Sequence, residues 1–311
     1  VGKEFGVVMP EVRLTDDPAL ESGTYRINVH GVEQAHGFLN PNLMLALLDG
    51  IDEAADQNTV EEPVYGAPAI WIEHDAQENS SLSGQTVVSP CEVLATHILE
   101  CLRKNLGRLL TFKALQRLLD ELVNLSDASR AKANRRLLDE LVPEKVPLDV
   151  LHSVLRLLLV EQVSIRNLPI IIEAIAKLRP IHSNAEATCE FVRQALGFQL
   201  IANLKRADGT IPLIQLAPEW EQTFATYQLD AEQGAANIAL PPNLFSKLVS
   251  SIAEQVSEQS ERGVHPAIVT STQRRRFLRT VMAARGISAP VLSFEEIGTE
   301  AVPSIVGVAA A

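Results

Sequence analysis

Cysteine is scarce in this chain of 311 residues, which contains only three. Cys91, Cys101 and Cys189 are odd in number and form no Cys-x-x-Cys pair. This favours a reducing compartment over a disulfide framework or a zinc site. Cys91 and Cys101 both fall within a helical pattern, so we expect buried or half-buried structural thiols.

Long hydrophobic runs are also missing. No apolar segment approaches the ~18–20 residues that a membrane-spanning helix needs, although 46% of the residues are hydrophobic. The chain begins Val-Gly-Lys, with no methionine and no signal-peptide pattern. We expect a soluble polypeptide that is a fragment of something longer. At roughly 100–200 residues per domain, it should form two or three compact units.

Motifs that carry chemistry are absent as well. The sequence has no P-loop, no dinucleotide-binding glycine pattern and no nucleophile elbow. No two of its seven histidines stand four residues apart, as a helical metal pair would. We interpret His30 and His36 as surface loop residues, and His97 as a core or interface imidazole hydrogen-bonded to a neighbour. Arg274-Arg275-Arg276 could contact phosphate, but consecutive helical residues cover different faces, which favours a solvated surface. We expect no cofactor, no metal and no enzymatic activity.

The chain does have an uneven distribution of charge along its sequence. Residues 1–100 carry 3 basic and 17 acidic side chains, a net charge of −14, whereas the remainder carries 24 basic and 22 acidic ones. A negative field repels phosphate backbones, so nucleic acid is excluded as a partner of this region. Basic partners are favoured, with an association rate that falls as salt rises. Composition alone favours the simpler alternative, that acidic surface keeps the chain soluble.

Local patterns predict a mixed α/β start to the chain. Alternating apolar residues indicate short strands, and a helical segment begins the stretch 41–60. Ser89, Pro90 and Glu92 form a capping box with proline at the first helical position, which predicts a helix from residue 90. The expected strands cover residues 7–14, 25–30, 69–73 and 86–88.

Helices follow one another through residues 110–178, which predicts an all-α bundle unit. Thr111 caps the first, Pro143 ends the second, Pro147 opens the third, and Leu168-Pro169 opens the fourth.

The last third is predicted to be α/β. Ser183 and Glu186 read as a capping box for a helix that Gly197 stops, and the turn at 207–210 indicates a hairpin between 198–205 and 211–216. Helices are expected near 218–228, from Pro241 and over 272–285. Strands at 267–270 and 291–292 complete a βαβ unit, and Ser293 caps a further helix. The apolar tail 301–311 is expected to be loosely held.

The order and spacing of several segments together closely resemble the cytoplasmic half of the FlhA/LcrD family, the large export-gate component of flagellar and virulence type III secretion systems. The similarity extends from about Phe5-Gly6 to Val291–Glu296, nearly the whole chain. The segments that carry it are Glu62–Glu73, Gly84–Pro90, Val93–His97, Glu140–Pro143, Val154–Asn167 and Val192–Gly197.

The resemblance implies a fold of α+β class with four subdomains. Two are α/β, one is a small inserted β/α subdomain and the central one is helical. It further implies a missing transmembrane half, a position on the cytoplasmic face of the bacterial inner membrane, and assembly into a nonameric ring. The implied subdomains are 1–40 plus 90–109, 41–89, 110–182 and 183–311.

The resemblance also implies a binding site. In flagellar relatives, export chaperones dock in a hydrophobic dimple between the first two subdomains. Glu62 and Tyr65 stand where the family often has Asp and Phe, so we expect a carboxylate rim and an aromatic floor. Without the resemblance, Tyr65 would be interpreted as a turn residue packed on Trp71. Gly6 matches a family glycine, which implies a hinge or a close-packing site. The implied dimple residues are Glu62, Tyr65, Val88, Val93 and Thr96.

The implied function is docking and gating in flagellar protein export. The expected partners are export chaperone–substrate complexes, components of the export ATPase complex, other membrane export-gate proteins and further copies of the chain. Negative charge near the dimple could steer complexes that carry basic patches. Two alternatives are the equivalent domain of a virulence injectisome and an uncharacterised α/β enzyme.

Overall fold

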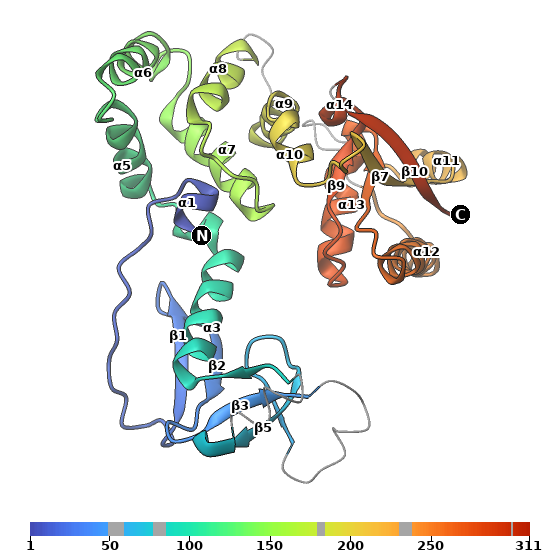
Figure 1. Cartoon of the computed structure of the whole chain (residues 1–311). Helices are drawn as coiled ribbons and strands as arrows, with labels where there is room; N and C mark the ends of the chain where they lie inside the picture. The colour runs from blue at the N-terminus through green and yellow to red at the C-terminus, as the bar shows by residue number, and fades with distance from the viewer. Residues whose placement is uncertain (49–58, 77–84, 179–183, 230–237, 300) are drawn as a thin grey trace. The chain divides into compact units, whose positions relative to one another are not determined.

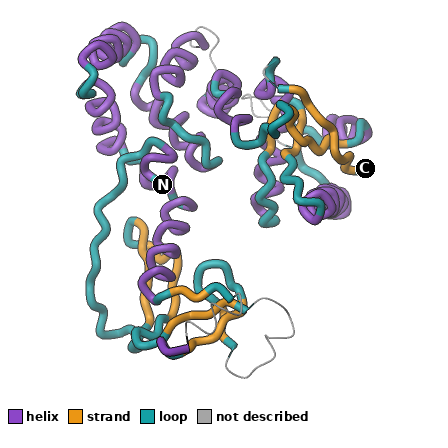
Figure 2. The backbone as a smooth tube through the Cα atoms, viewed as in Figure 1, coloured by secondary structure: helices purple, strands orange, loops and turns teal. Residues whose placement is uncertain are grey.

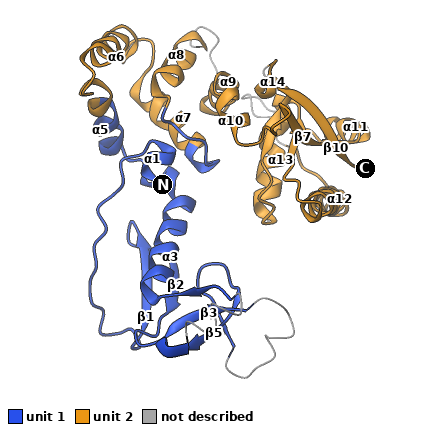
Figure 3. Cartoon of the chain, in the orientation of Figure 1, with its two compact units in different colours: residues 1–119, 159–166 blue, residues 120–158, 167–311 orange. Residues whose placement is uncertain are grey.

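A computed structural model describes residues 1–48, 59–76, 85–178, 184–229, 238–299 and 301–311 (Figure 1). The chain divides into two compact units, which are described separately (Figure 3). Unit 1 comprises residues 1–119 and 159–166, and unit 2 comprises residues 120–158 and 167–311. Mixed helices and sheets confirm the expected fold class. The four-subdomain division remains a prediction.

Unit 1 contains a hairpin packed on a helix (Figure 1). Strands β1 (Thr24–Val29) and β2 (Val32–Phe38) are antiparallel, which confirms the strand expected at 25–30. His30 and Gly31 connect them with φ of 51° and 78°, as twisted two-residue hairpins require. Helix α3 (Pro90–Lys104) contacts β2 and begins with the predicted capping box.

The second sheet of unit 1 is small and antiparallel, in the order β4-β5-β3-β6. The strands expected at 69–73 and 86–88 are confirmed. The helix expected at the start of 41–60 is wrong, because Met44–Leu47 is a strand, with Leu45 and Ala46 fully buried. Residues 49–58 lie outside the described part of the chain. The bounds are β3 Met44–Leu47, β4 Val60–Glu61, β5 Pro68–Ile72, β6 Val87–Val88, and a 3₁₀ turn, η2, at His74–Ala76.

The N-terminal segment of unit 1 begins with a short helix that is held against residues 159–166. Helix α1 (Gly2–Phe5) joins the segment 159–166 through an Ile165 amide that donates to the Phe5 carbonyl at 2.8 Å. The strand expected at 7–14 is wrong, since these residues form no ladder and the Leu14 side chain is 93% exposed. Helices α4 (Leu106–Leu109) and α5 (Phe112–Val123) follow α3.

Unit 2 begins with the predicted helices. The Asp127 carboxylate caps α6, and α7 buries Leu151, Val154, Leu155 and Leu158 completely. The bounds are α6 Ala128–Leu141, α7 Leu148–Val160 and α8 Leu168–Leu178.

The rest of unit 2 is a parallel sheet with helices on both faces (Figure 2). The strand order is β10-β7-β8-β9. One face buries Trp220, Phe224, Leu248, Ile252 and Leu278, which come from α11, α12 and α13. The opposite face packs against Ile201 of α10 and Ile297 of α14. The bounds are α9 Ala185–Ala195, α10 Gly197–Ala202, β7 Thr210–Leu216, α11 Glu219–Thr226, α12 Pro242–Glu261, β8 Ala267–Thr270, α13 Thr272–Ala284, β9 Val291–Ser293, α14 Phe294–Ile297 and β10 Val302–Ala309.

Several expectations for this region are corrected. The hairpin is wrong, because Gly197–Ala202 is helix α10 and only Thr210–Leu216 is a strand. The tail is not loosely held, because β10 pairs with β7. Asn184 is the N-cap of α9, while Ser183 lies outside the described residues. The βαβ unit and the Ser293 capping box are confirmed.

The arginine run at 274–276 is also not a solvated surface. Arg275 is fully buried and pairs with Glu190, and its Nε lies 3.8 Å from the Glu296 carboxylate. The same carboxylate accepts from Arg193 Nε at 2.6 Å. Arg274 is buried too, with its guanidinium over the Phe224 ring. These ion pairs connect α9, α13 and α14 inside unit 2.

A glycine in unit 1 provides a first test. Gly6 has φ of 74°, and a β-carbon there would meet the backbone of Arg166 at 2.8 Å. Gly31 has φ of 78° but nothing within 4 Å of such a carbon. Gly31→Ala should therefore lose only the cost of left-handed backbone, ~1–2 kcal/mol, and Gly6→Ala should lose clearly more. Urea unfolding of both variants measures the difference. Equal losses would show that the approach of Arg166 is not a constraint.

The buried ion pairs provide a second test. Glu296→Gln should reduce the free energy of unfolding by about 3–5 kcal/mol, because two buried guanidinium groups lose their shared carboxylate. The exposed neighbour Glu295, which accepts from the Thr272 hydroxyl at 2.7 Å, is the control. Glu295→Gln should cost no more than about 1 kcal/mol. A loss for Glu296→Gln as small as that of the control, in denaturant titrations, would contradict the interpretation.

Candidate functional site

The candidate site is built on a tight turn at residues 62–66 of unit 1. The Glu62 amide donates to the Ala67 carbonyl at 2.8 Å, and the Gly66 amide donates to the Glu62 carbonyl at 2.9 Å. The two carboxylate oxygens of Glu62 accept from the amides of Val64 and Tyr65, at 3.0 and 2.7 Å. Gly66 has φ of 70°, which favours glycine. The carboxylate therefore holds the backbone of the turn.

This turn directs Tyr65 outward. The Tyr65 side chain is 70% exposed, whereas Glu62 is only 6% exposed. The expected rim and floor are thus reversed: the carboxylate is buried and the aromatic ring faces solvent. Tyr65 is also not packed away on Trp71, whose ring lies edge-on to Phe38 at 6.4 Å.

The exposed ring lies next to α3. Partial desolvation and the Glu100 carboxylate, to which the phenol hydrogen-bonds, raise the pKa of Tyr65. Thr96 is one helical turn before Glu100, and residues four apart share a face of a helix. Thr96 is half-buried. Tyr65 and Thr96 therefore lie on the same side of α3.

The remaining implied residues lie beneath this surface. Val93 is 3% exposed and forms a small core with Leu45 and Ala69, against which Val64 and Val88 pack. Val88 and Val93 thus support the turn and helix from below, and Tyr65 and Thr96 are the accessible pair. The structure brings all five implied residues into one part of unit 1.

A buried histidine joins this region to the hairpin. The Tyr25 hydroxyl lies 2.7 Å from His97 Nδ1, and the two rings meet edge to face. Burial lowers the pKa of the His97 imidazole, and burial with the nearby Glu62 carboxylate raises the pKa of Tyr25 to about 12. The expected partner for His97 is confirmed. Both groups are therefore uncharged near neutral pH.

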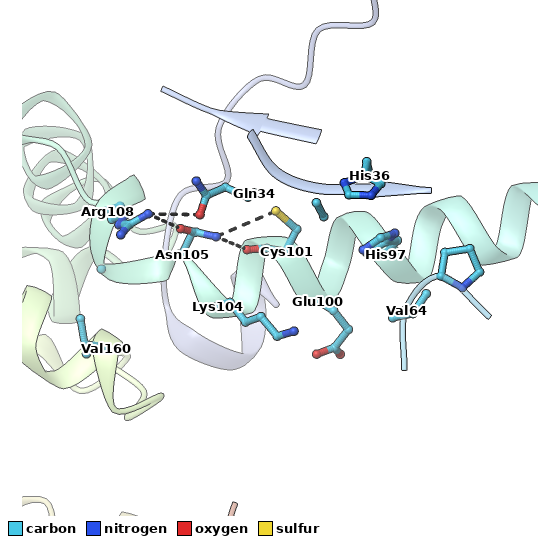
Figure 4. Close-up of a pocket in the computed structure, with 13 residues that line it drawn as sticks. Gln34, His36, Val64, His97, Glu100, Cys101, Lys104, Asn105, Arg108 and Val160 are labelled. Carbon is cyan, nitrogen blue, oxygen red and sulfur yellow. Dashed lines mark hydrogen bonds between the residues drawn. The ribbon is translucent and has the colours of Figure 1, made fainter. Parts of the chain in front are cut away.

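A hollow of about 640 Å³ continues from the turn along α3 (Figure 4). Sequence patterns gave no reason to select its polar lining, because Gln34 meets Lys104, Asn105 and Arg108 only in the fold. A smaller hollow of about 380 Å³ lies against Glu62 on Phe38, Leu45 and Trp71.

Among the described residues, no three His, Cys, Asp or Glu side chains are grouped to hold an ion, and no helix is long and apolar enough to cross a membrane. Cys101 is buried as expected, and Cys189 is buried too, but Cys91 is exposed, which corrects the expectation for that residue.

Comparison with known proteins gives the family. Residues 1–302 match the model of the FHIPEP family. The flagellar biosynthesis protein FlhA of Caulobacter vibrioides is 31% identical over 99% of this chain and 43% of its own length. FlhA of Borreliella burgdorferi is 28% identical over 94% of this chain and 41% of its own length. The chain thus spans less than half the length of these relatives.

Solved structures agree on the fold. The Chlamydia pneumoniae CdsV protein superposes with a TM-score of 0.79 at 20% identity, covering 99% of this chain and 87% of that one. CdsV in its complex with CdsO gives 0.78 at 21% identity, covering 99% and 86%. The nonameric EPEC SctV-C gives 0.75 at 16% identity, covering 99% and 90%. At such identities the likeness shows the fold alone.

The family model covers nearly the whole chain, and the relatives that carry the FlhA name align with almost all of it. Proteins of this family are secretion components, which agrees with the expectation that the chain is not an enzyme. The chain belongs to the FHIPEP family and is similar to flagellar FlhA proteins, as the resemblance in its sequence indicated.

Proposed function

We propose that this chain is a docking and gating domain of the flagellar type III export gate, which binds export chaperone–substrate complexes and passes substrates to a membrane channel. The observation that carries the proposal is the exposed Tyr65, held outward by the buried Glu62 and placed beside Thr96 on α3. An exposed aromatic side chain on a rigid support is typical of protein-binding hot spots.

An aromatic ring that is exposed to water loses this unfavourable contact when it docks on a protein, which favours an interface role for Tyr65. A tyrosine contributes a large, rigid contact area for little conformational entropy, and its hydroxyl tolerates both water and an interface. The two accessible residues sit on a supported turn and a capped helix, so little order has to be gained on binding. The negative charge of residues 1–100 would speed the approach of complexes with basic patches.

The wider assembly is part of the proposal. A homologous protein, CdsV, forms a complex with CdsO, and SctV-C is a nonamer. By analogy, this chain would assemble into a nonameric ring at the cytoplasmic face of the inner membrane, next to other export-gate proteins. It would also contact export ATPase components there.

Loss of the aromatic side chain tests docking directly. Tyr65→Ala should weaken binding of a chaperone–substrate complex by at least about 2 kcal/mol, roughly 30-fold, because the anchor is removed. Thr96→Met should also weaken it, since added bulk fills the space beside Tyr65. Phe112, another exposed aromatic residue of unit 1, is the control. Calorimetric titration of each variant, after circular dichroism has confirmed its fold, gives the affinities.

The proposal fails if Tyr65→Ala and Thr96→Met bind as tightly as the unaltered chain. It also fails if Phe112→Ala weakens binding as much as Tyr65→Ala, because the effect would then not be specific to the candidate site.

The flagellar assignment can be tested against the injectisome alternative. The FlhA relatives are 28–31% identical to this chain, whereas the CdsV and SctV-C structures are 16–21% identical. In parallel pull-downs, the chain should therefore retain flagellar export chaperones and not virulence chaperones. Preferential retention of virulence chaperones would reverse the assignment.

A further inference from the structure

The hollow along α3 has two chemically different ends (Figure 4). Pro63 and Val64 line the end next to the turn, where His97 is kept neutral by burial. Lys104 and Arg108 line the other end, together with the exposed Val160. The distance along α3 from His97 to Lys104 is about 10 Å, from seven residues at ~1.5 Å each. The hollow is therefore an elongated groove, apolar at one end and cationic at the other.

The part of the chain that the structure describes provides no paired carboxylate for either cation at this end. Arg108 donates from Nη1 to the amide oxygens of Gln34 and Asn105, at 3.1 and 3.3 Å, and both acceptors are neutral. Among the described residues, no carboxylate oxygen lies within 4.0 Å of the Lys104 ammonium group. The adjacent Arg103 differs, since it pairs with both Glu4 and Glu100. Glu100 also lines the groove, but its carboxylate pairs with Arg103, so Arg108 and the exposed Lys104 are groove cations that have no paired carboxylate among the described residues.

The helix dipole explains only one of the two cations in the groove. Lysine is favoured in the last turn of any helix by the helix dipole, which accounts for the residue type at position 104. It accounts less well for Arg108, which lies in the four-residue helix α4, where the dipole is small, and which is oriented by two amide side chains. An oriented guanidinium in a groove is suited to paired hydrogen bonds with a carboxylate.

We propose that this groove binds an acidic segment of a protein partner, with carboxylates at Lys104 and Arg108 and an apolar side chain at Pro63 and Val64. This rests on the proposed docking function and specifies the chemistry of the partner. The groove is continuous with the Tyr65 surface through Glu100, which contacts Tyr65 and also lines the groove. One docked segment could occupy both.

Charge and shape together favour a protein segment over other anions. The field of residues 1–100, with a net charge of −14, opposes a polyanion such as nucleic acid. A neutral or basic protein that carries only a few carboxylates is not repelled as a whole by this field, and its carboxylates can reach Lys104 and Arg108. A small anion would leave the apolar end of a 640 Å³ groove unused.

Helical peptides test the proposal on the full chain. The first probe is an alanine-based peptide with a leucine near one end and two glutamates about two helical turns further on. Two counterparts carry glutamine or lysine in place of glutamate. By fluorescence anisotropy at low salt, the glutamate peptide should bind at least tenfold more tightly than the glutamine peptide. The double variant Lys104→Glu/Arg108→Glu should reverse this order in favour of the lysine peptide.

The matched control is Lys113→Glu/Arg117→Glu, which makes the same change of charge at the same spacing on exposed positions of unit 1. It should leave the preference for glutamate unchanged. Equal binding of the glutamate and glutamine peptides, no binding of any peptide, or an equal loss in the control would overturn the proposal. Displacement of the glutamate peptide by inorganic phosphate at a similar concentration would also overturn it, in favour of a small-anion site.

A negative result for the acidic-segment proposal can be distinguished from a negative result for the docking function. If Tyr65→Ala abolishes binding of the chaperone–substrate complex while the Lys104/Arg108 variant shows none of these effects, docking stands and the acidic-segment proposal falls.

Discussion

The candidate site depends on one buried carboxylate. Removing an ionised carboxylate from water is costly unless it is hydrogen-bonded, and Glu62 meets this condition by accepting two consecutive backbone amides of its own turn. Those bonds fix the direction in which the chain presents Tyr65. The same charge acts on the phenol of Tyr25 and on the imidazole of His97, so it reaches the hairpin and α3 as well. The carboxylate of Glu62 thus influences the turn at 62–66, strand β1 and helix α3.

Helix α3 forms the surface that lies beside this turn. Val93, His97 and Cys101 face the interior, while Thr96 and Glu100 follow a neighbouring stripe towards the exposed Tyr65. The capping box at Ser89 and Glu92 satisfies the first free amides of the helix, so its start is well defined. Because a helix is stiff, the spacing between the aromatic end and the cationic end is fixed before any partner arrives. Such preorganisation reduces the entropy that binding would otherwise cost.

The sequence correctly predicted the helices whose first turn carries a capping box. The capping boxes at Ser89 and Ser293 marked two helix starts correctly, because each involves residues only three positions apart. Met44–Leu47 was assigned to a helix, because a short apolar run does not distinguish a buried strand from a helix. Its partners, β5 and β6, lie far along the chain. Strand β10 was missed for the same reason, since its partner β7 precedes it by about ninety residues.

The candidate site was likewise predicted only in part from the sequence. Family resemblance identified Glu62 and Tyr65, but only the fold shows that the carboxylate is inside and the ring outside. Arg275 was expected on the surface because its carboxylate partner, Glu190, is 85 residues away. Lys104 and Arg108 were not selected, since a cation near a helix end is ordinary until Gln34 and Val160 complete a groove around it.

The two units use charge in opposite ways, and this bears on where recognition takes place. Unit 2 buries Arg193, Arg275 and Glu296 together, so their charges satisfy one another inside the fold. A buried pair contributes little net stability, and breaking it to bind a partner would be costly. Lys104 and Arg108 in unit 1 are exposed, and neither is paired with a carboxylate of the described residues. A partner carboxylate that reaches them gains attraction without first disrupting an existing pair, so a charged ligand is bound at lower cost in unit 1.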